Sequence, residues 1–357
     1  MSRRLAHSRG LGRGRSVPSV VYAASRGDDK LIIFSLDEKS GTLTLVSEMS
    51  LPRGPAPIAF HPSKAVLYIG LRESRELAAF RINPSGELSP LRAVLLESDP
   101  TYLSLDRKAN FIFSAYFLAG AVAVHALSED GTVRHPPIEW IKTGTGAHSI
   151  QADRSNRFVF APHVAGPDRP DAIFQYRFDG HTGRLTPNAP ARVSAEKGAG
   201  PRHLYWHPSK DILYCTNEQE ASVSAFSFDS AVGLLTPLQT VAAAPQGQPG
   251  WHMCAGIQVL PSGSFLYASV RGYDGGYNGI ACFAIDQVTG LLSLKERVDS
   301  EPIPHGLSRD RYGKFLFVTC QETGRLVVYR IDEKTGGLER LASYPIGRNP
   351  LWAVASP

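Results

Sequence analysis

The chain has 357 residues, of which 43% are hydrophobic and 20% are charged, so it can bury the core of a soluble protein. No apolar run approaches the roughly 18 residues that a membrane-spanning helix needs. The formal net charge of +5 equals the contribution of five arginines within residues 1–16, which contain no acid. The rest of the chain is formally neutral, and we expect no nucleic-acid binding from it. Residues 1–16 are predicted to be a disordered arginine-rich tail, and residues 17–357 a single domain.

A pattern of four strands and two turns repeats along residues 17–357. In each copy a short strand leads into a first turn, which reads His-Pro-Ser-Lys at 61–64 and again at 207–210. An aromatic-apolar strand follows, then a loop and a third strand. Successive copies lie roughly 45 to 54 residues apart, which is the spacing of four-stranded propeller blades.

The second turn of each copy contains a glycine suited to positive φ, and strands of period two follow it. Seven such turns occur, with glycines at Gly41, Gly86, Gly131, Gly183, Gly233, Gly290 and Gly336. Seven turns predict seven blades. The copies begin near Val20, Ile58, Tyr102, Ser149, His203, Gly256 and Gly306.

The two ends of the repeat region complement each other. The first copy has no strand before Val20, whereas Leu-Trp-Ala-Val-Ala at 351–355 has a strand pattern and no blade of its own. Pairing of these segments would remove an exposed sheet edge. We therefore predict an all-β fold, a seven-bladed β-propeller of four-stranded antiparallel blades whose ring is closed by the C-terminal strand.

Histidines, arginines and one glutamate collect on one face of the predicted ring. The loops before innermost strands and the loops after second strands share this face, so their side chains are expected to form a polar pocket. The opposite face is expected to hold only turn-forming residues. The candidates before innermost strands are His148, Arg202, His203, His252 and His305, and those after second strands include Arg72, Tyr116, His163, Asn217, Glu218 and Arg271.

Structural roles compete with functional ones for several candidates. A lone His148 could be a satisfied core residue, but the glycine-rich flank at 144–147 would let backbone approach a ligand and favours a site. Arg202 and Glu218 belong to one blade and could form an ordinary ion pair. The four cysteines form no Cys-x-x-Cys pair, so buried free thiols, no metal and a reducing, cytoplasmic location are expected.

A family resemblance rests on Gly-Ala-His-Ser at 146–149, Gly-Ala-Gly-Pro-Arg-His at 198–203, Tyr-Cys-Thr-Asn-Glu at 214–218 and Arg-Gly at 271–272. Over its length from about Val20 onward, the chain resembles the bacterial propeller-type 6-phosphogluconolactonases, which share their fold with fungal 3-carboxy-cis,cis-muconate lactonizing enzymes. The resemblance implies a cytosolic, metal-independent enzyme without a cofactor. Its presumed site residues match His148, Arg202, Glu218 and Arg271.

The sequence also departs from the family pattern on the same face. Gly-Ile-Gln at 256–258 stands where the family has an acid, an apolar residue and a histidine. His305 replaces an arginine, and His163 replaces an aspartate. These three changes bear on the substrate and on whether the site is active.

Three hypotheses follow. The first is a hydrolase of a sugar-acid lactone, with 6-phosphogluconolactone as leading substrate: Arg202 and Arg271 hold its anionic end, His148 acts as general base and Glu218 orients it. The second is a muconate-type cycloisomerase, and the third a non-enzymatic propeller that binds a ligand or protein. In each case the expected partner is a small anionic lactone or carboxylate, or a protein in the third, with no membrane and a monomeric chain. Further substrate-binding candidates are His203, Asn217, His252, His305, Tyr116 and His163.

Overall fold

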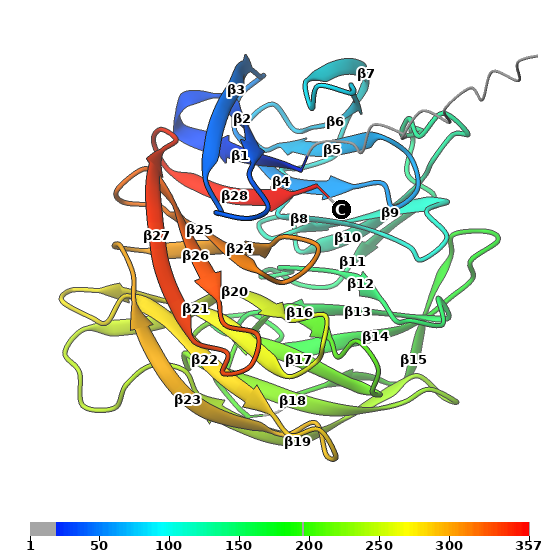
Figure 1. The fold of residues 1–357 in the computed structure, drawn as a ribbon. Coiled ribbons are helices and arrows are strands. Elements are labelled where there is room, and N and C mark those ends of the chain that lie inside the picture. Colours follow the sequence, from blue (N-terminus) through cyan, green and yellow to red (C-terminus); the bar gives the residue numbers. More distant parts are fainter. Residues whose placement is uncertain (1–18, 195, 357) are drawn as a thin grey trace, which may run out of the picture.

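The computed structural model describes residues 19–194 and 196–356, which form seven four-stranded antiparallel sheets arranged as the blades of a ring (Figure 1). This confirms the predicted β-propeller. The predicted tail at residues 1–16 lies outside the described residues. Among the described residues, no helix has the length and apolar character required to cross a membrane.

Each blade is given from its innermost to its outermost strand. The first blade contains β28 (Pro350–Ala355), β1 (Val20–Ser25), β2 (Lys30–Leu36) and β3 (Leu43–Ser50), with the short 3-10 helix η1 (Arg26–Asp28) between β1 and β2. The second contains β4 (Pro55–Phe60), β5 (Val66–Leu71), β6 (Glu76–Ile82) and β7 (Leu88–Leu95). The third contains β8 (Tyr102–Leu105), β9 (Phe111–Tyr116), β10 (Ala121–Ala126) and β11 (Glu139–Lys142). The fourth contains β12 (Gln151–Ala152), β13 (Phe158–His163), β14 (Ala172–Phe178) and β15 (Leu185–Val193).

The remaining three blades follow the same order. The fifth contains β16 (Pro201–Trp206), β17 (Ile212–Asn217), β18 (Ser222–Asp229) and β19 (Leu234–Ala242). The sixth contains β20 (Trp251–Val259), β21 (Phe265–Tyr273), β22 (Gly279–Ile285) and β23 (Leu292–Asp299). The seventh contains β24 (Pro304–Arg309), β25 (Phe315–Cys320), β26 (Arg325–Ile331) and β27 (Leu338–Pro345).

The ring closes through the C-terminal strand. β28 pairs antiparallel with β1, with Ala23 opposite Ala353 and Tyr22 opposite Val354. In Figure 1 the red β28 accordingly lies beside the blue β1. The predicted closure is confirmed, and because the two chain ends share one sheet, the first blade cannot separate without breaking this pairing.

Both predicted turn types have a clear local cause. The Nδ1 atom of His61 accepts hydrogen bonds from the backbone N–H groups of Ser63 and Lys64, at 3.2 and 3.1 Å, and His207 does the same in its own turn. These two histidines are therefore turn residues. The glycines of the second turns all have positive φ, between 73° and 89°, which a residue with a side chain rarely adopts.

Neighbouring blades are joined by a repeated tyrosine contact. Tyr22, Tyr68 and Tyr214 lie fully buried on second strands, and each donates its hydroxyl to the carbonyl of a turn glycine in the next blade at 2.7 Å. The acceptors are Gly86, Gly131 and Gly290. Each bond satisfies a buried hydroxyl and fixes one blade against the next. The loops of different blades are thereby held at constant positions around the axis.

Candidate active site

Glu218 follows β17 and is the centre of a charged cluster drawn from three blades. Its Oε2 accepts a hydrogen bond from Nε of Arg202 at 2.6 Å and lies 3.2 Å from Nη2 of Arg271. The same oxygen is 3.8 Å from Nε2 of His148. One carboxylate thus faces two guanidinium groups and an imidazole, so the cluster carries excess positive charge in a water-poor setting.

Arg202 lies on β16, and its side chain is only 2% exposed. Besides Glu218, its guanidinium contacts Nε2 of His203 at 3.3 Å and Nε2 of His305 at 3.2 Å. Because Nε and both Nη atoms have protein partners, the Arg202 guanidinium has a fixed orientation. It joins Glu218 to two histidines that approach from different blades.

The three histidines of the cluster are held neutral. Burial lowers the pKa of His148 well below its usual range, and the nearby charge of Arg202 lowers it further. Burial and Arg202 act in the same direction on the pKa values of His203 and His305. Burial and Arg271 lower the pKa of Arg202 to about 10, so Arg202 stays charged at neutral pH. A neutral His148 can accept a proton, and its buried Nδ1 has no partner among the described residues.

Glycine-containing segments bring these side chains together. The N–H of Glu218 donates to the carbonyl of Gly200, two residues before Arg202, at 2.6 Å. Gly200 has φ of +75°, and a Cβ there would lie 1.7 Å from the Gln219 side chain and 3.0 Å from backbone. The N–H of His148 in turn donates to the carbonyl of Pro162 at 3.0 Å. A side chain at position 200 would therefore clash with Gln219, the residue after Glu218.

A cavity of about 220 Å³ opens beside the cluster. A smaller cavity of about 100 Å³ shares His305 and Trp352 with it and extends along the channel axis. Residues from several blades line the larger one, so a ligand there would contact His148 and Arg202 directly. Its lining consists of Ala56, Arg72, Thr101, Phe117, His148, Arg202, His305, Leu351 and Trp352.

The structure brings together six of the eleven candidates in one network: His148, Arg202, His203, Glu218, Arg271 and His305. A seventh, Arg72, lines the adjoining cavity. His203 completes the network by packing its ring 5.1 Å from that of His148. The sequence reasoning did not find Thr101, Phe117 or Trp352 as cavity residues. Trp352 lies on the ring-closing strand, so the predicted closure placed its backbone near the axis but not its side chain in the cavity.

The other four candidates make contacts outside this network. His163 bonds the carbonyl of Ala161 and the hydroxyl of Thr143, at 3.0 and 2.7 Å, and is completely buried. Asn217 donates to two serines of its own blade, the Tyr116 hydroxyl accepts from Ser114, and His252 accepts from the N–H of Tyr277. These contacts support structural roles, because the polar groups of all four side chains have partners away from the Glu218 cluster.

The departures at 256–258 also have a structural explanation. Gln258 donates from Nε2 to the carbonyl of Leu307 at 3.0 Å, which joins the innermost strands of the sixth and seventh blades. A Cβ on Gly256 would lie 2.7 Å from the backbone nitrogen of Leu307. Both residues therefore suit a close approach of these two strands.

Comparison with known proteins places this arrangement in context. Residues 16–94 and 50–355 match the family described as "Lactonase, 7-bladed beta-propeller". A 6-phosphogluconolactonase of Pectobacterium carotovorum is 34% identical over 93% of this chain and 97% of its own length. One of Serratia proteamaculans is 31% identical over 93% of this chain and 97% of its own. The solved structure of a periplasmic gluconolactonase of Pseudomonas aeruginosa, PpgL, has a TM-score of 0.85 and 25% identity, covering 95% of this chain and 99% of that one.

Proposed function

The chain belongs to the seven-bladed β-propeller lactonase family, and on that basis we propose that it hydrolyses 6-phosphogluconolactone. The observation that carries the proposal is the contact of Glu218 with Arg202, Arg271 and His148 at the edge of the cavity. Relatives named 6-phosphogluconolactonase that match over nearly the whole chain support the choice of substrate.

His148 is the proposed general base. Because burial keeps its imidazole neutral, it can take a proton from a water molecule as that water attacks the lactone carbonyl carbon. A tetrahedral intermediate forms, and its collapse breaks the bond between the carbonyl carbon and the ring oxygen. The proton held by His148 passes to the departing ring oxygen, which becomes a hydroxyl, and the imidazole is neutral again.

The positive charge of the cluster is suited to the oxyanion of that intermediate. Arg202 lines the cavity, and its guanidinium is already oriented by Glu218, His203 and His305, so little rearrangement is required as negative charge develops. Arg202 and Arg271 therefore act as fixed sources of positive charge. This differs from the role first expected for them, which was to hold the anionic end of the substrate.

Arg72 is the proposed partner of the substrate phosphate. It lines the same cavity after β5, and its Nη2 lies 2.9 Å from Asp99, so its guanidinium is positioned without being tied to Glu218. Its side chain is 18% exposed, which leaves it accessible from the mouth. Arginine suits phosphate because its planar donors match two phosphate oxygens.

The same charges argue for a reaction without a metal ion. The Glu218 carboxylate already faces two guanidinium groups, and their charges would repel a divalent cation.

We further propose a cytoplasmic location. The four cysteines are free and buried, and burial raises the pKa values of Cys215 and Cys254 to about 12, as suits thiols that remain reduced.

The test is hydrolysis of freshly generated 6-phosphogluconolactone, followed by the release of acid and corrected for spontaneous hydrolysis. Glucono-1,5-lactone, which lacks the phosphate, is assayed in parallel. The proposal predicts saturable hydrolysis of the phosphorylated lactone at much higher kcat/KM. A rate indistinguishable from spontaneous hydrolysis for both lactones would reject it, and a preference for the unphosphorylated lactone would reject the phosphate role of Arg72.

A further inference from the structure

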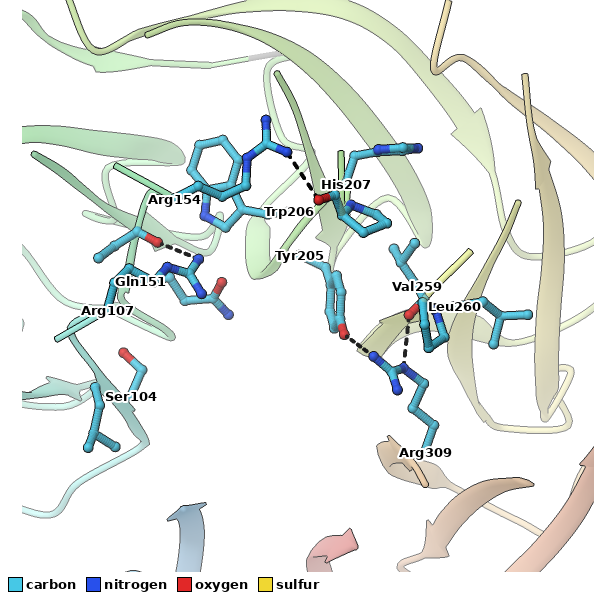
Figure 2. Close-up of a pocket in the computed structure, with 14 residues that line it drawn as sticks. Ser104, Arg107, Gln151, Arg154, Tyr205, Trp206, His207, Val259, Leu260 and Arg309 are labelled. Atoms are coloured by element: carbon cyan, nitrogen blue, oxygen red, sulfur yellow. Dashed lines mark hydrogen bonds between the residues drawn. The ribbon is translucent and has the colours of Figure 1, made fainter. Parts of the chain in front are cut away.

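The opposite end of the central channel holds a second and larger cavity, of about 430 Å³ (Figure 2). It is lined by the ends of the innermost strands and the first turns of the third to seventh blades, on the face where only turn-forming residues were expected. That expectation was wrong, because three arginines line this cavity: Arg107, Arg154 and Arg309. Figure 2 shows Arg107 and Arg154 on one side of Tyr205 and Arg309 on the other.

Arg107 is held in place by backbone carbonyls. It follows β8, and its Nε and Nη2 donate to the carbonyls of Asp153 and Ala152 in the next blade, at 3.0 and 2.9 Å. Its Nη1 has no partner among the described residues. A carbonyl orients a guanidinium but does not neutralise it, so the full charge of Arg107 stays at the cavity wall.

Arg309 is fixed in the same way from the other side. It ends β24, and its Nε donates to the carbonyl of Val259 at 3.0 Å, while Nη1 donates to the carbonyl of Asp310 at 2.9 Å. Its Nη2 is 3.3 Å from the hydroxyl of Tyr205, the contact drawn at the centre of Figure 2. Two arginines from distant blades are thus oriented before any ligand arrives.

Two of these arginines form no direct ion pair with a described residue. Within the described part of the chain, the one carboxylate within 4 Å of any of the three guanidinium groups is that of Asp211, which is 2.7 Å from Arg154. The three buried aspartates nearby accept hydrogen bonds from backbone N–H groups of their own turns; they are Asp106, Asp153 and Asp310. Arg107 and Arg309 therefore have no carboxylate at contact distance among residues 19–194 and 196–356, although the aspartates beside them in the chain carry negative charge.

The size and walls of this cavity fit a small metabolite. Its volume lies within the range of small-molecule sites. Tyr205 and the side chain of Leu260 add apolar surface, and Gln151 adds an amide. The narrower 100 Å³ cavity lies between this cavity and the catalytic one, sharing Gln151 and Tyr205 with the former and His305 with the latter. A ligand in the larger cavity, beside Arg107 and Arg309, would therefore be separate from a substrate beside His148.

We propose that this second mouth is a binding site for a small molecule that carries at least two anionic groups, phosphates or carboxylates. The pre-oriented charges of Arg107 and Arg309 are its main determinants, with Arg154 as a third, solvent-accessible contact. The site does not depend on the proposed lactonase reaction, because none of its arginines belongs to the Glu218 cluster.

The experiment is isothermal titration calorimetry of the full chain with inorganic pyrophosphate and, in a second arm, citrate. Binding of either probe supports the proposal if the double variant Arg107→Gln/Arg309→Gln weakens it at least tenfold, and the comparison of probes tells phosphate from carboxylate preference. Arg157→Gln is the matched control, since Arg157 lies in the same turn as Arg154 but bonds Ser155 and Ser230. It should leave the affinity unchanged.

Two outcomes would overturn the proposal. One is the absence of binding by both probes at millimolar concentration. The other is binding that is lost in Arg271→Gln and unchanged in the double variant, which would place the anion in the candidate active site beside Glu218.

A second measurement, on the wild-type chain, tests the proposal if the double variant does not fold. Arginines are modified with phenylglyoxal with and without pyrophosphate, and the modified positions are identified by mass spectrometry. Pyrophosphate should slow modification of Arg107 and Arg309 several-fold and leave Arg157 unaffected. Equal modification rates at Arg107 and Arg309 in both conditions would contradict the proposed site.

Discussion

Oε2 of Glu218 accepts a hydrogen bond from Nε of Arg202 at 2.6 Å, and this bond lies at the centre of the candidate active site. The pair is largely buried, with side-chain exposures of 12% and 2%. A buried ion pair adds little net stability by itself, but removing one partner leaves an uncompensated charge. Its value here is geometric, because the same carboxylate faces Arg271 and His148.

Glu218→Gln should therefore lower activity and stability together. The amide keeps the size of the side chain but removes the charge that orients two arginines, and we expect kcat to fall at least about 100-fold. The free energy of unfolding should fall by about 3 kcal/mol. Steady-state kinetics and urea denaturation measure these effects. Glu220→Gln, two residues further on, is the matched control and should retain activity; equal activity of both variants would contradict the role of Glu218.

The pH dependence of activity follows from the low pKa of His148. Its imidazole is the active base when neutral, so kcat/KM should be constant from pH 8 down to about 6.5 and should fall only at clearly lower pH. An acid limb centred near pH 6.5 or above would contradict this assignment.

Stability should respond to pH in the same direction. Below about pH 6.5 the unfolded chain takes up protons on His148, His203 and His305, while the folded chain does not, because their folded-state pKa values are lowered. The free energy of unfolding contributed by these groups is therefore fully present above pH 6.5 and declines as the pH falls. Urea denaturation at several pH values checks the sign, and a rise in stability on acidification would contradict it.

Arg72→Gln should separate substrate binding from chemistry. If Arg72 binds the phosphate, KM for 6-phosphogluconolactone should rise about tenfold or more, since a charge-assisted hydrogen bond is lost. The KM for glucono-1,5-lactone should not change. Arg75→Gln, a substitution in the same loop, serves as the control. A parallel change in KM for both lactones would show that Arg72 acts on the shape of the cavity instead.

The tyrosine contacts between blades predict a purely structural effect. Tyr214→Phe removes the hydroxyl that bonds the carbonyl of Gly290 and should lower the free energy of unfolding by about 1 kcal/mol. Activity should be unchanged at temperatures where the variant is folded. Tyr312→Phe, at a tyrosine that is 49% exposed, should leave stability within experimental error of wild type. An unchanged free energy of unfolding in Tyr214→Phe would mean that the contact contributes no net stability.

The fold could be predicted from the sequence because its repeat is local. The turn glycines, from Gly41 to Gly336, mark one blade each, and the unpaired strand pattern at 351–355 indicated how the ring closes. The convergence of His148, Arg202 and Glu218 followed from the same logic, since the repeat determines the face on which each loop lies.

The direction of single side chains could not be predicted in this way. His163 ends β13 on the expected face of the ring, but its imidazole bonds the hydroxyl of Thr143 instead of joining the cluster. Its ring centroid lies 4.4 Å from that of Phe174. Arg107 lies in a first turn, and its guanidinium takes its direction from hydrogen bonds to the carbonyls of Asp153 and Ala152 in the neighbouring blade. Such outcomes depend on contacts between blades, and the periodicity of one strand contains no information about them.

The most direct test of the central claim is the rate of 6-phosphogluconolactone hydrolysis by His148→Asn, with His181→Asn as a surface control. General-base catalysis by His148 predicts a loss in kcat of about 100- to 10,000-fold, with the unfolding transition retained and the control fully active. A His148→Asn variant that is folded and hydrolyses the lactone at the wild-type rate would contradict the account.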